Sequence, residues 1–398
     1  MKISVIIPTY WTSSKPTIQH QAPDAVYDHP VPLESQSTLP RLLDSLKNVD
    51  LPGELTISII VAVTHRALEE MAKRKTKEVI DSYTDYLDIK LFSASTLRDL
   101  ESTDKNLARL LSLYGYSEIR NIGLAIAQIL ESDIIVFLDD DEVINDKKYF
   151  LKAQEHIGKN IDGKLLGGVA GYYTDEHGEY HLNVNPKAWW KLFWPKEKKM
   201  NEAFKIIARK HRLSETTFAF GGNMILYWKM FERVPFDPYI TRGEDMDLLV
   251  NAKRSGFKFM LDTQLKVIHH PGEGKTLWSE MRQDLYRFLY MRQKMLSTKE
   301  TRHKEIVSIA SLEPYPGYFL GAGTCFKFVA SSFLNCLHSF LVRNLENFQE
   351  FARNIREIRS AFHYVAKHSQ KYHSFQSQWA GYLPSIRGKK ILKNVLQG

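Results

Sequence analysis

The sequence predicts an α/β protein with a doubly wound, mostly parallel sheet, followed by a mainly helical C-terminal region. Runs that are apolar throughout, such as ISVII (3–7) and LTISIIVAV (55–63), alternate with segments whose apolar residues recur at helical spacing. Such strands are buried on both faces, which requires helices on both sides of a parallel sheet. We divide the chain into a sheet domain at 1–274 and a basic helical region at 275–398.

Each element is inferred from its apolar period and its flanking residues. Pro8 is expected to end the first strand, because proline lacks the N–H that a sheet ladder needs. Residues 11–37 are polar and carry four prolines, and a loop of this length is usually functional or disordered. The other expected elements are a helix at 37–48 capped by Ser37 or Thr38, a strand at 55–63, a helix at 67–83, a strand at 89–94, a helix at 117–130 capped by Ser117 and a strand at 133–138.

The composition is that of a globular protein, with 43% hydrophobic and 25% charged residues. The N-terminal apolar run is too short for a signal peptide. Cys325 and Cys336 form neither a disulfide framework nor a metal-ligand pattern. These features predict a cytoplasmic protein, with the inner face of the cell membrane as the alternative location.

Positive charge is concentrated in the C-terminal third. Residues 275–398 hold 19 Lys and Arg and 8 Asp and Glu, a balance of +11, whereas residues 1–274 hold 35 and 38, a balance of −3. This excess favours an anionic partner, such as a membrane surface or an acidic substrate, unless it is only a solvated face.

Three polar stretches follow expected strands. They are Pro8–Tyr10, Thr64–His65 and the acid cluster of Asp139, Asp140, Asp141 and Glu142. Ligands of parallel α/β sheets bind beyond the carboxyl ends of the strands, so the three are expected to meet at one crevice. Asp139 and Asp141 form a D-x-D pair within reach of one hard cation, and Mg²⁺ and Mn²⁺ prefer such oxygen ligands together with substrate phosphates. An ordinary acidic turn is the alternative.

Three later stretches add to this site. AFGGNMIL (219–226) pairs Gly221 with Gly222, which suits a close approach between backbone and ligand or an ordinary turn. LKVIHHPGEG (265–274) ends an expected strand in His269 and His270, which are metal-ligand candidates or structural histidines. TRGEDMDLL (241–249) begins an expected helix with Glu244, Asp245 and Asp247 beside Arg242; acids there cap helices, and one could also serve as a general base.

Taken in order, these motifs resemble those of the family-2 glycosyltransferases and their GT-A-fold relatives. The matching pieces are SVIIPTY, IRNIGLAIA, FLDDDE, GGNMIL, GEDMDL and the HH strand end, and they span about residues 1–274. The resemblance implies transfer of a sugar from a UDP- or GDP-linked donor to a hydroxyl acceptor, with Mn²⁺ or Mg²⁺ as cofactor. It specifies neither the sugar nor the acceptor.

The resemblance also implies residue roles. Asp245 would be the general base of an inverting enzyme, and Glu244 would orient the acceptor. Asp141, with Asp139, would hold the metal, and His270, in preference to His269, would complete its shell. The residues implied to bind the nucleotide sugar are Pro8, Thr9, Tyr10, Thr64, Arg120, Asn121, Gly123, Asp139, Asp140, Gly221, Gly222, Asn223 and Arg242.

Two departures from the family pattern are visible. The second strand ends in VAVTHRA, without the acid-rich turn that often holds the base or ribose, which leaves the nucleobase and the part of Thr64 open. Residues 11–37 form a longer loop than usual, in which Asp28 and His29 are expected to be surface residues.

The expected function is synthesis of an envelope glycan or glycolipid. The alternatives are a retaining or inverting transferase acting on a small soluble acceptor such as glycerate or a sugar phosphate, a nucleotidyltransferase, and a non-catalytic binding module. The segment PTYWTSSKP lacks the glycine-rich phosphate loop of a nucleotidyltransferase. Acids at strand ends would repel nucleic acid, and no zinc or aromatic RNA-binding pattern is present.

Two helices are expected in the C-terminal region, at 277–296 and within 318–342. The second carries an apolar stripe that includes Phe326, Phe333 and Phe340, but Lys327 and His338 make it unsuitable as a membrane span. We expect this helix to pack on the catalytic domain; a homodimer interface and peripheral contact with a membrane are the alternatives.

Overall fold

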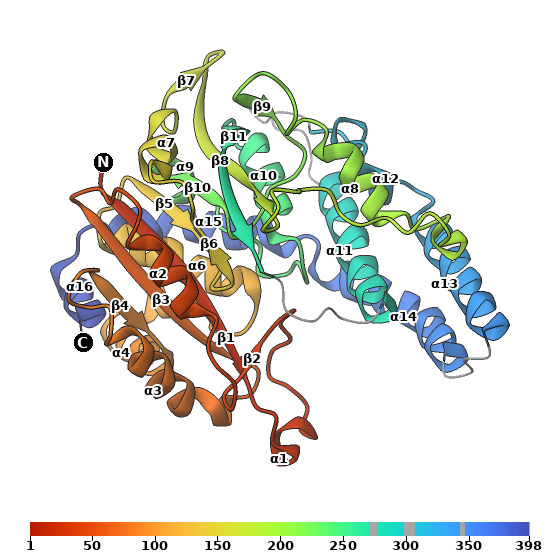
Figure 1. Cartoon of the computed structure of the whole chain (residues 1–398), viewed down its shortest axis with the longest axis horizontal. Helices are drawn as coiled ribbons and strands as arrows, with labels where there is room; N and C mark the ends of the chain where they lie inside the picture. Colours follow the sequence, from red (N-terminus) through yellow and green to blue (C-terminus); the bar gives the residue numbers. More distant parts are fainter. Residues whose placement is uncertain (271–276, 298–306, 343–346, 398) are drawn as a thin grey trace.

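The structure is a computed structural model that describes residues 1–270, 277–297, 307–342 and 347–397. A single sheet forms its centre, with strand order β4-β3-β1-β5-β10-β8-β11-β6, and β2, β7 and β9 pair at its margins (Figure 1). The strands are β1 (Ile3–Thr12), β2 (Val31–Pro32), β3 (Leu55–Val63), β4 (Ile89–Phe92), β5 (Ile134–Phe137), β6 (Glu142–Val143), β7 (Asn160–Ile161), β8 (Lys164–Thr174), β9 (Leu213–Glu215), β10 (Met224–Tyr227) and β11 (Lys258–His269).

The sheet is mostly parallel, as expected. β4, β3, β1 and β5 run in one direction. β10 is antiparallel to both β5 and β8, so β8 and its parallel neighbour β11 run in the direction of β5. The carboxyl ends of β1, β5, β8 and β11 therefore lie at the same edge of the sheet.

Helices cover both faces of the sheet, so the doubly wound prediction is confirmed. Ile3, Val5 and Ile7 of β1 pack in one core with α2, α3 and α7, whereas Ile6 packs in a second core with α6 and α10. This division follows from the alternation of side chains along a strand. The helices of residues 1–270 are α1 (Pro16–Gln19), α2 (Leu39–Leu46), η1 (Arg66–Leu68), α3 (Glu69–Ile80), α4 (Ala94–Thr103), α5 (Lys105–Ala108), α6 (Tyr116–Ile129), α7 (Tyr149–Glu155), η2 (Trp189–Lys191), α8 (Lys196–Phe204), α9 (Trp228–Phe231) and α10 (Glu244–Arg254).

The expectation that Pro8 ends the first strand is wrong, because β1 continues to Thr12 and Pro8 pairs with Ile60. The carbonyl of Ile6 accepts a hydrogen bond from Leu138 just beyond β5, and Pro8, two residues further on, faces the same side. β5 has already ended at that level, so an N–H at position 8 would have no strand to pair with, and proline is tolerated there.

The cap of α6 also differs from the expectation. The helix begins at Tyr116, after Gly115 at φ 129°, so Ser117 lies inside its first turn rather than at the cap. The segment expected to be one long loop is partly ordered, because it contains the end of β1, the short helix α1 and the short strand β2.

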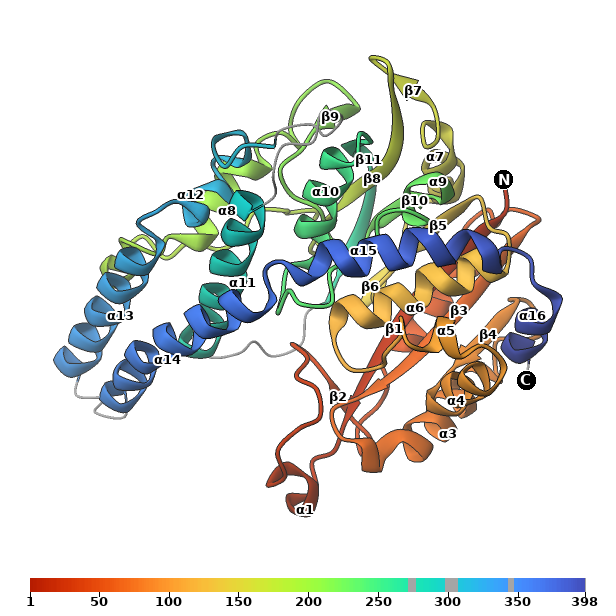
Figure 2. The same cartoon turned by 180° about the vertical axis from the view of Figure 1, so that it is seen from behind.

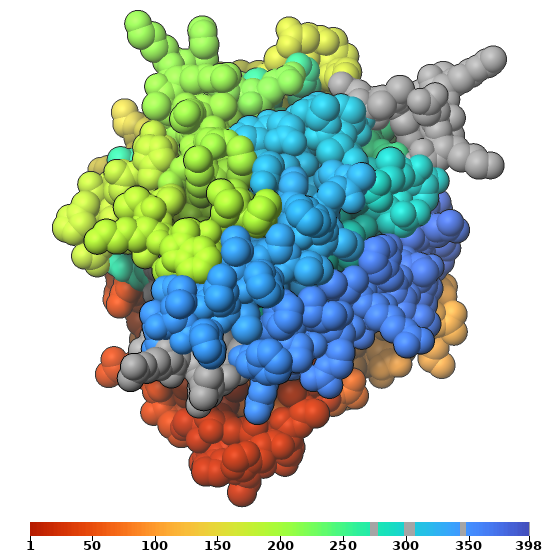
Figure 3. All heavy atoms as spheres, turned by 90° about the vertical axis from the view of Figure 1, so that its right-hand side faces the viewer, coloured from red at the N-terminus to blue at the C-terminus, as the bar shows by residue number. Residues whose placement is uncertain are grey.

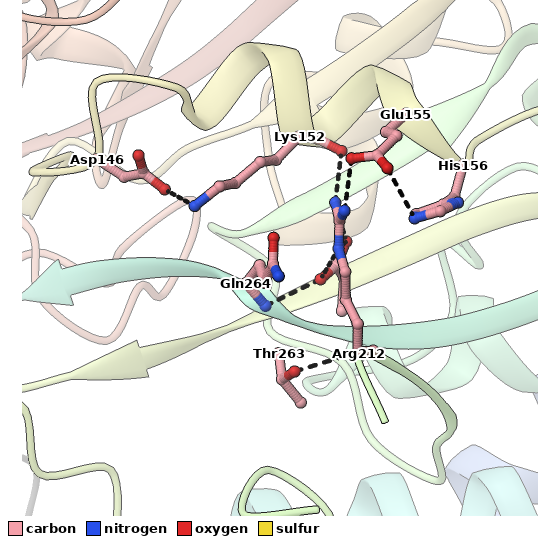
Figure 4. A network of polar contacts seen from close by, with 8 residues as sticks. Asp146, Lys152, Glu155, His156, Arg212, Thr263 and Gln264 are labelled. Atoms are coloured by element: carbon pink, nitrogen blue, oxygen red, sulfur yellow. Dashed lines mark hydrogen bonds and ion pairs between the residues drawn. The ribbon is translucent and has the colours of Figure 1, made fainter. Parts of the chain in front are cut away.

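Arg212 ties α7 to β11, the strand that ends at His269. Its guanidinium binds the carboxylate of Asp262 in β11 through Nε at 3.0 Å and also contacts Glu155 and the carbonyl of Lys152 in α7 (Figure 4). This network holds the helix against the strand on the side of the sheet away from α10.

The last helices, α15 (Lys371–Tyr382) and α16 (Lys390–Gln397), run back over the sheet domain (Figure 2). Trp379 in α15 donates its indole N–H to the carbonyl of Phe231 at 2.9 Å, and Lys393 in α16 pairs with Glu131. The helix expected within 318–342 is α13 (Thr324–Leu341), and it contacts the segment around η2, where the Ser331 hydroxyl donates to the carbonyl of Trp190 at 3.1 Å. The other elements of this region are α11 (Leu277–Ser297), η3 (Ala310–Leu312), α12 (Gly317–Leu320), α14 (Asn347–His368) and η4 (Leu383–Ile386).

The proposed domain boundary at 274/275 lies outside the described residues, so the division into two domains stays a prediction. Within the described residues, each helix is either too short or too polar to cross a membrane.

Candidate active site

A cavity of about 670 Å³ opens at the edge where β1, β5, β8 and β11 end. Tyr10, Asp139, Tyr173 and His269 line it, one from the end of each strand. The expected convergence of the first strand end with the acid cluster is therefore confirmed. It arises because the four strands are parallel.

Thr64 does not reach this cavity. Its hydroxyl donates to the hydroxyl of Thr12 at 2.9 Å, and its carbonyl accepts from the backbone N–H groups of Asp24 and Ala25. Thr64 therefore fastens the long N-terminal loop to the end of β3. The expectation that Thr64–His65 would share the crevice is wrong, because this loop occupies the space beyond β3.

Arg120 of α6 connects three segments that are distant in sequence. Its Nε donates to Glu244 at 3.0 Å, its Nη1 to the carbonyl of Gly221 at 2.8 Å and its Nη2 to Asp139 at 3.3 Å. The side chain is almost wholly buried, so these contacts are poorly screened. Arg120 thus fixes the relative positions of the acid cluster, the glycine pair and the start of α10.

The acid cluster meets Arg120 at Asp139 and His269 at Asp141 among the described residues. Among the described residues, no lysine or arginine forms an ion pair with Asp140, Asp141 or Glu142, and Asp140 Oδ2 and Glu142 Oε1 are buried without a hydrogen-bond partner. Burial raises the pKa of Asp140 to about 7; the nearby hydroxyls of Thr9 and Thr38 act to lower it, and the charges of Asp141 and Asp139 add to the increase. Burial and the same two neighbours also hold the pKa of Glu142 well above its usual range. The cluster therefore carries unsatisfied acceptors in a low-dielectric position, which is the donor set that a divalent cation prefers.

The two histidines at the end of β11 differ in their surroundings. His269 lines the cavity, lies with Nε2 3.5 Å from Asp141 Oδ2 and stacks on Tyr173. Burial lowers the pKa of His269, but the hydrogen bond and charge of Asp141 and the charge of Asp139 outweigh it and leave the pKa raised. His270 instead faces Glu176 at 3.4 Å and does not line the cavity. The expected preference for His270 is therefore reversed, because successive residues of a strand point in opposite directions.

No group of three or more His, Cys, Asp or Glu side chains converges as a complete metal shell within the described residues. The residues nevertheless fit a cation that keeps some positions for substrate oxygens, since Asp141 and His269 offer an oxygen and a nitrogen side by side.

The glycine pair lets the acids and Arg120 approach the backbone. A Cβ atom at Gly221 would lie 2.4 Å from Arg120 Nη2, and one at Gly222 would lie 2.1 Å from Glu142 Oε1 and 2.6 Å from Asp139 Oδ2. Asn223 was expected to shape the sugar side, but it points into the sheet, where it accepts from the Tyr149 hydroxyl at 2.7 Å. Gly221 lines the cavity, whereas Asn223, directly before β10, does not.

The start of α10 presents Glu244 and Asp245 to the cavity, after Gly243 at φ 72°. Burial, and next the charge of Glu244, raise the pKa of Asp245 to about 7. Asp247 faces the opposite way and pairs with Lys294 of α11. On this helix Asp247 therefore has a structural partner in Lys294, whereas Glu244 and Asp245 line the cavity.

The remaining expected site residues are close to the cavity without lining it. Asn121 exchanges two hydrogen bonds with the backbone of Phe236, at 3.0 and 2.9 Å. A Cβ at Gly123 would lie 2.7 Å from Ile6, so this glycine lets α6 pack on β1. Pro8 and Thr9 are buried within β1. A direct role in ligand binding for these four stays a prediction.

Asp28 and His29 were expected at the surface, and this was wrong, because both line the cavity. Asp28 pairs with Arg242 at 3.0 Å, so the long loop closes one side of the site. Tyr27 of the same loop packs with Tyr10 and Tyr116 in a cluster of three rings.

Other wall residues were missed. The hydroxyl of Tyr173 accepts a hydrogen bond from the backbone N–H of Gly222 at 2.7 Å. The rule that ligands meet strand ends could have found it, because it lies next to the end of β8. Arg287 and Tyr315, which hydrogen bond to each other, come from the C-terminal region. Nothing local in the sequence marks them.

Comparisons with known proteins place the chain near several solved structures. No protein-family model and no curated protein matches it. The mannosyltransferase PcManGT from Pyrobaculum calidifontis, in complex with GDP-Man and Mn²⁺, is 12% identical with a TM-score of 0.48, over 97% of this chain and 86% of that one. TarS 1–349 from S. aureus, in complex with UDP, is 14% identical with a TM-score of 0.42, over 97% and 90%. GalNAc-T7 with UDP, GalNAc and Mn²⁺ is 14% identical with a TM-score of 0.41, over 78% and 53%.

These likenesses are distant, and the assignment to the family-2 glycosyltransferases stays a prediction.

Proposed function

We propose that this protein is a metal-dependent glycosyltransferase that moves a sugar from a nucleotide-diphosphate sugar to a hydroxyl acceptor with inversion of configuration. The observation that carries the proposal is the acid-rich cavity, in which carboxylates that follow β5 and carboxylates that begin α10 face one another around the single guanidinium of Arg120. A site of this kind suits a cation and an anionic diphosphate together better than either alone.

Asp141 and His269 would hold Mn²⁺ or Mg²⁺, with Asp139 beside them. The cation would supply positive charge next to the leaving diphosphate. Arg120 contributes a fixed charge on the other side of Asp139 and keeps that carboxylate in place. The lone acceptors of Asp140 and Glu142 would gain a nearby positive charge when the cation binds.

Asp245 would act as the general base. A pKa of about 7 leaves its carboxylate able to take the proton of an acceptor hydroxyl near neutral pH. The proton moves from the acceptor oxygen to the carboxylate while that oxygen attacks the sugar carbon and the diphosphate leaves. Glu244, held by Arg120 at 3.0 Å, would accept a hydrogen bond from the acceptor.

The tyrosine cluster and the loop that carries Asp28 and His29 would form the nucleotide end of the cavity. Tyr10 lines the cavity, and its hydroxyl is buried without a hydrogen-bond partner among the described residues. Tyrosine rings provide flat surfaces on which a base can stack. Gly221, Gly222 and Arg242 would lie along the sugar and diphosphate.

Thermal-shift measurements test the proposal. GDP-mannose and UDP-linked sugars are the first donors to compare, each with Mn²⁺, Mg²⁺ or EDTA. A donor at 100 times its Kd should stabilise the fold by about 2.7 kcal/mol, and this gain should disappear in EDTA. A well-folded sample that responds to no donor would instead favour a non-catalytic binding module.

The acceptor is the open part of the proposal. Envelope glycan or glycolipid synthesis is the preferred role, and a small anionic acceptor such as glycerate or a sugar phosphate is the second. Lys196, Arg242 and Arg287 line the cavity wall, but each is paired with a carboxylate of this chain, so their charges do not choose between the two acceptors. A nucleotidyltransferase is less favoured, since β1 is followed by no glycine-rich phosphate loop.

A further inference from the structure

The exposed side of the helix α13 is largely apolar, and its buried side carries polar residues. Its apolar stripe was expected to be buried or to lie at an interface, and Phe326, Phe333 and Phe340 are 68%, 54% and 67% exposed. Its polar residues Ser332 and Asn335 are buried instead. The buried side packs through hydrogen bonds, such as that from Asn354 of α14 to the hydroxyl of Ser332 at 3.0 Å.

The exposed apolar side chains of α13 continue onto its two neighbours. His338 stacks on Trp190 at 3.6 Å, and Phe326 meets Phe193 edge to face, so the segment around η2 lies against α13. Trp189 and Leu192 of that segment are exposed as well. Figure 3 views this end of the molecule, where the η2 segment, α13 and α14 lie side by side. We call this surface the apolar end face; its exposed members are Trp189, Leu192, Phe326, Phe333, Phe340 and Leu341.

The exposed charged side chains of α13 and α14 are basic among the described residues. The sequence of α13 contains no Asp or Glu. The exposed face of α14 carries Arg356 and Arg359 between Phe348 and Phe362, and Lys367 beyond Phe362. The acids of α14 point inward, because Glu350 pairs with Arg282 and Glu357 accepts from Tyr286. Exposed phenylalanine and tryptophan beside basic groups are the features of helices that lie in the interface of an anionic bilayer.

We propose that the apolar end face docks this protein on a membrane surface that contains anionic phospholipid, with α13 lying in the interface. The aromatic side chains enter the boundary between headgroups and acyl chains, and the basic side chains of α14 lie among the phosphates. The η2 segment connects this face to the cavity, since Lys196 and Met200 just beyond it line the cavity wall. Docking would bring the cavity close to the bilayer, where a lipid-linked acceptor is found.

Flotation of the full-length protein with vesicles tests this. Vesicles of phosphatidylcholine with about one-third phosphatidylglycerol should carry the wild type upward, and pure phosphatidylcholine should carry much less, because the basic side chains need anionic lipid. Leu341→Ser and Leu151→Ser form a matched pair, since the two leucines are 65% and 63% exposed and Leu151 lies on α7, at the far side of the sheet domain (Figure 1).

Leu341→Ser combined with Phe340→Ser should weaken binding to the anionic vesicles by about tenfold or more, whereas Leu151→Ser should leave it unchanged. Both positions are exposed, so the fold should survive, and thermal unfolding would verify this. Light scattering on the same samples measures the association state. Failure of the wild type to float, equal flotation with both lipids, or a dimer that the Phe340 and Leu341 substitutions disperse would each overturn the proposal.

Discussion

Asp245 and Asp247 lie within one helical turn of each other on α10, but their carboxylates have different surroundings. Asp247 is fully buried with Asp237, and Lys294 binds both at 2.5 to 2.7 Å. Asn251 and Tyr290 add hydrogen bonds to this group at 2.8 and 2.7 Å. Asp245, two residues before Asp247, faces the cavity and its uncompensated acids.

The cluster and the cavity differ in the partners that the protein provides for their buried carboxylates. In the Asp237–Lys294–Asp247 cluster the protein provides a cation and hydrogen bonds, which is what a buried charge needs for stability. Burial raises the pKa of Asp247 to about 6 even with Lys294 beside it. In the cavity the protein provides Arg120, burial raises the pKa of Asp140 to about 7, and one oxygen each of Asp140 and Glu142 has no hydrogen-bond partner among the described residues. Acids without an internal partner indicate a site that is completed from outside, by a metal ion or ligand.

Exchange of the two aspartates for asparagine is the strongest test of this comparison. We expect Asp245→Asn to lower kcat by about 10³-fold, within the usual range for a general base, while donor binding persists. Below pH 7 the wild-type rate should rise about tenfold per pH unit and then level off as the carboxyl ionises, because only the deprotonated form accepts a proton. Steady-state kinetics across pH checks this, with Asp247→Asn as the matched variant, which should keep the pH profile of the rate because Asp247 does not line the cavity. An unchanged rate in Asp245→Asn would remove the assignment.

Removal of the cation from the structural cluster should have the next largest effect. Lys294→Met would leave the fully buried carboxylates of Asp237 and Asp247 without a positive partner. We expect the free energy of unfolding to fall by about 3–5 kcal/mol, as is usual when one member of a buried ion pair is removed. Chemical denaturation measures it. A loss below about 1 kcal/mol would mean that this cluster is no better compensated than the cavity.

Removal of an acid from the cavity should raise the free energy of unfolding, which is opposite to the effect of Lys294→Met. In the absence of metal, Asp140→Asn should raise the stability at pH 8 on the order of 2 kcal/mol, because the folded state holds an ionised carboxyl in a buried position. The folded pKa is above the unfolded one, so the wild type loses stability as pH rises from about 4 to about 7, and the gain of the variant should grow over the same window. Urea unfolding at several pH values in EDTA would show this. Destabilisation at pH 8 would contradict it.

The smallest expected effect is the difference between His269 and His270 in metal binding. His269→Gln should weaken the Mn²⁺-dependent thermal stabilisation by about tenfold in apparent affinity, comparable to the loss of other groups that hold a metal. His270→Gln should change it by less than about twofold, because that ring faces Glu176 rather than Asp141. Titration of Mn²⁺ against both variants measures the difference. Equal losses would mean that the orientation of β11 at its end is not the one described.

Much of this architecture could be predicted from the sequence. Continuous apolar runs fixed the parallel sheet, and a strand that runs directly into Asp139 and Asp141 indicated the site, because the direction of parallel strands brings their ends to one edge. The acids at the start of α10 were found for a similar reason, since a helix N-terminus favours negative charge. These signals are local, so one chain is enough to read them.

Other features depend on contacts between residues that are far apart in sequence. The sequence could not separate Asp245 from Asp247, because the partner Lys294 is 47 residues away on α11. It could not place Asp28, His29 or Arg287 in the cavity wall, since a loop and a C-terminal helix bring them there. It assigned the stripe of α13 to the interior, because periodicity shows that a helix has an apolar side but not which way that side faces. The sequence alone determined which residue types follow each strand and begin each helix. The tertiary packing decided which of these side chains have an internal partner and which line the cavity, because the partners come from distant segments.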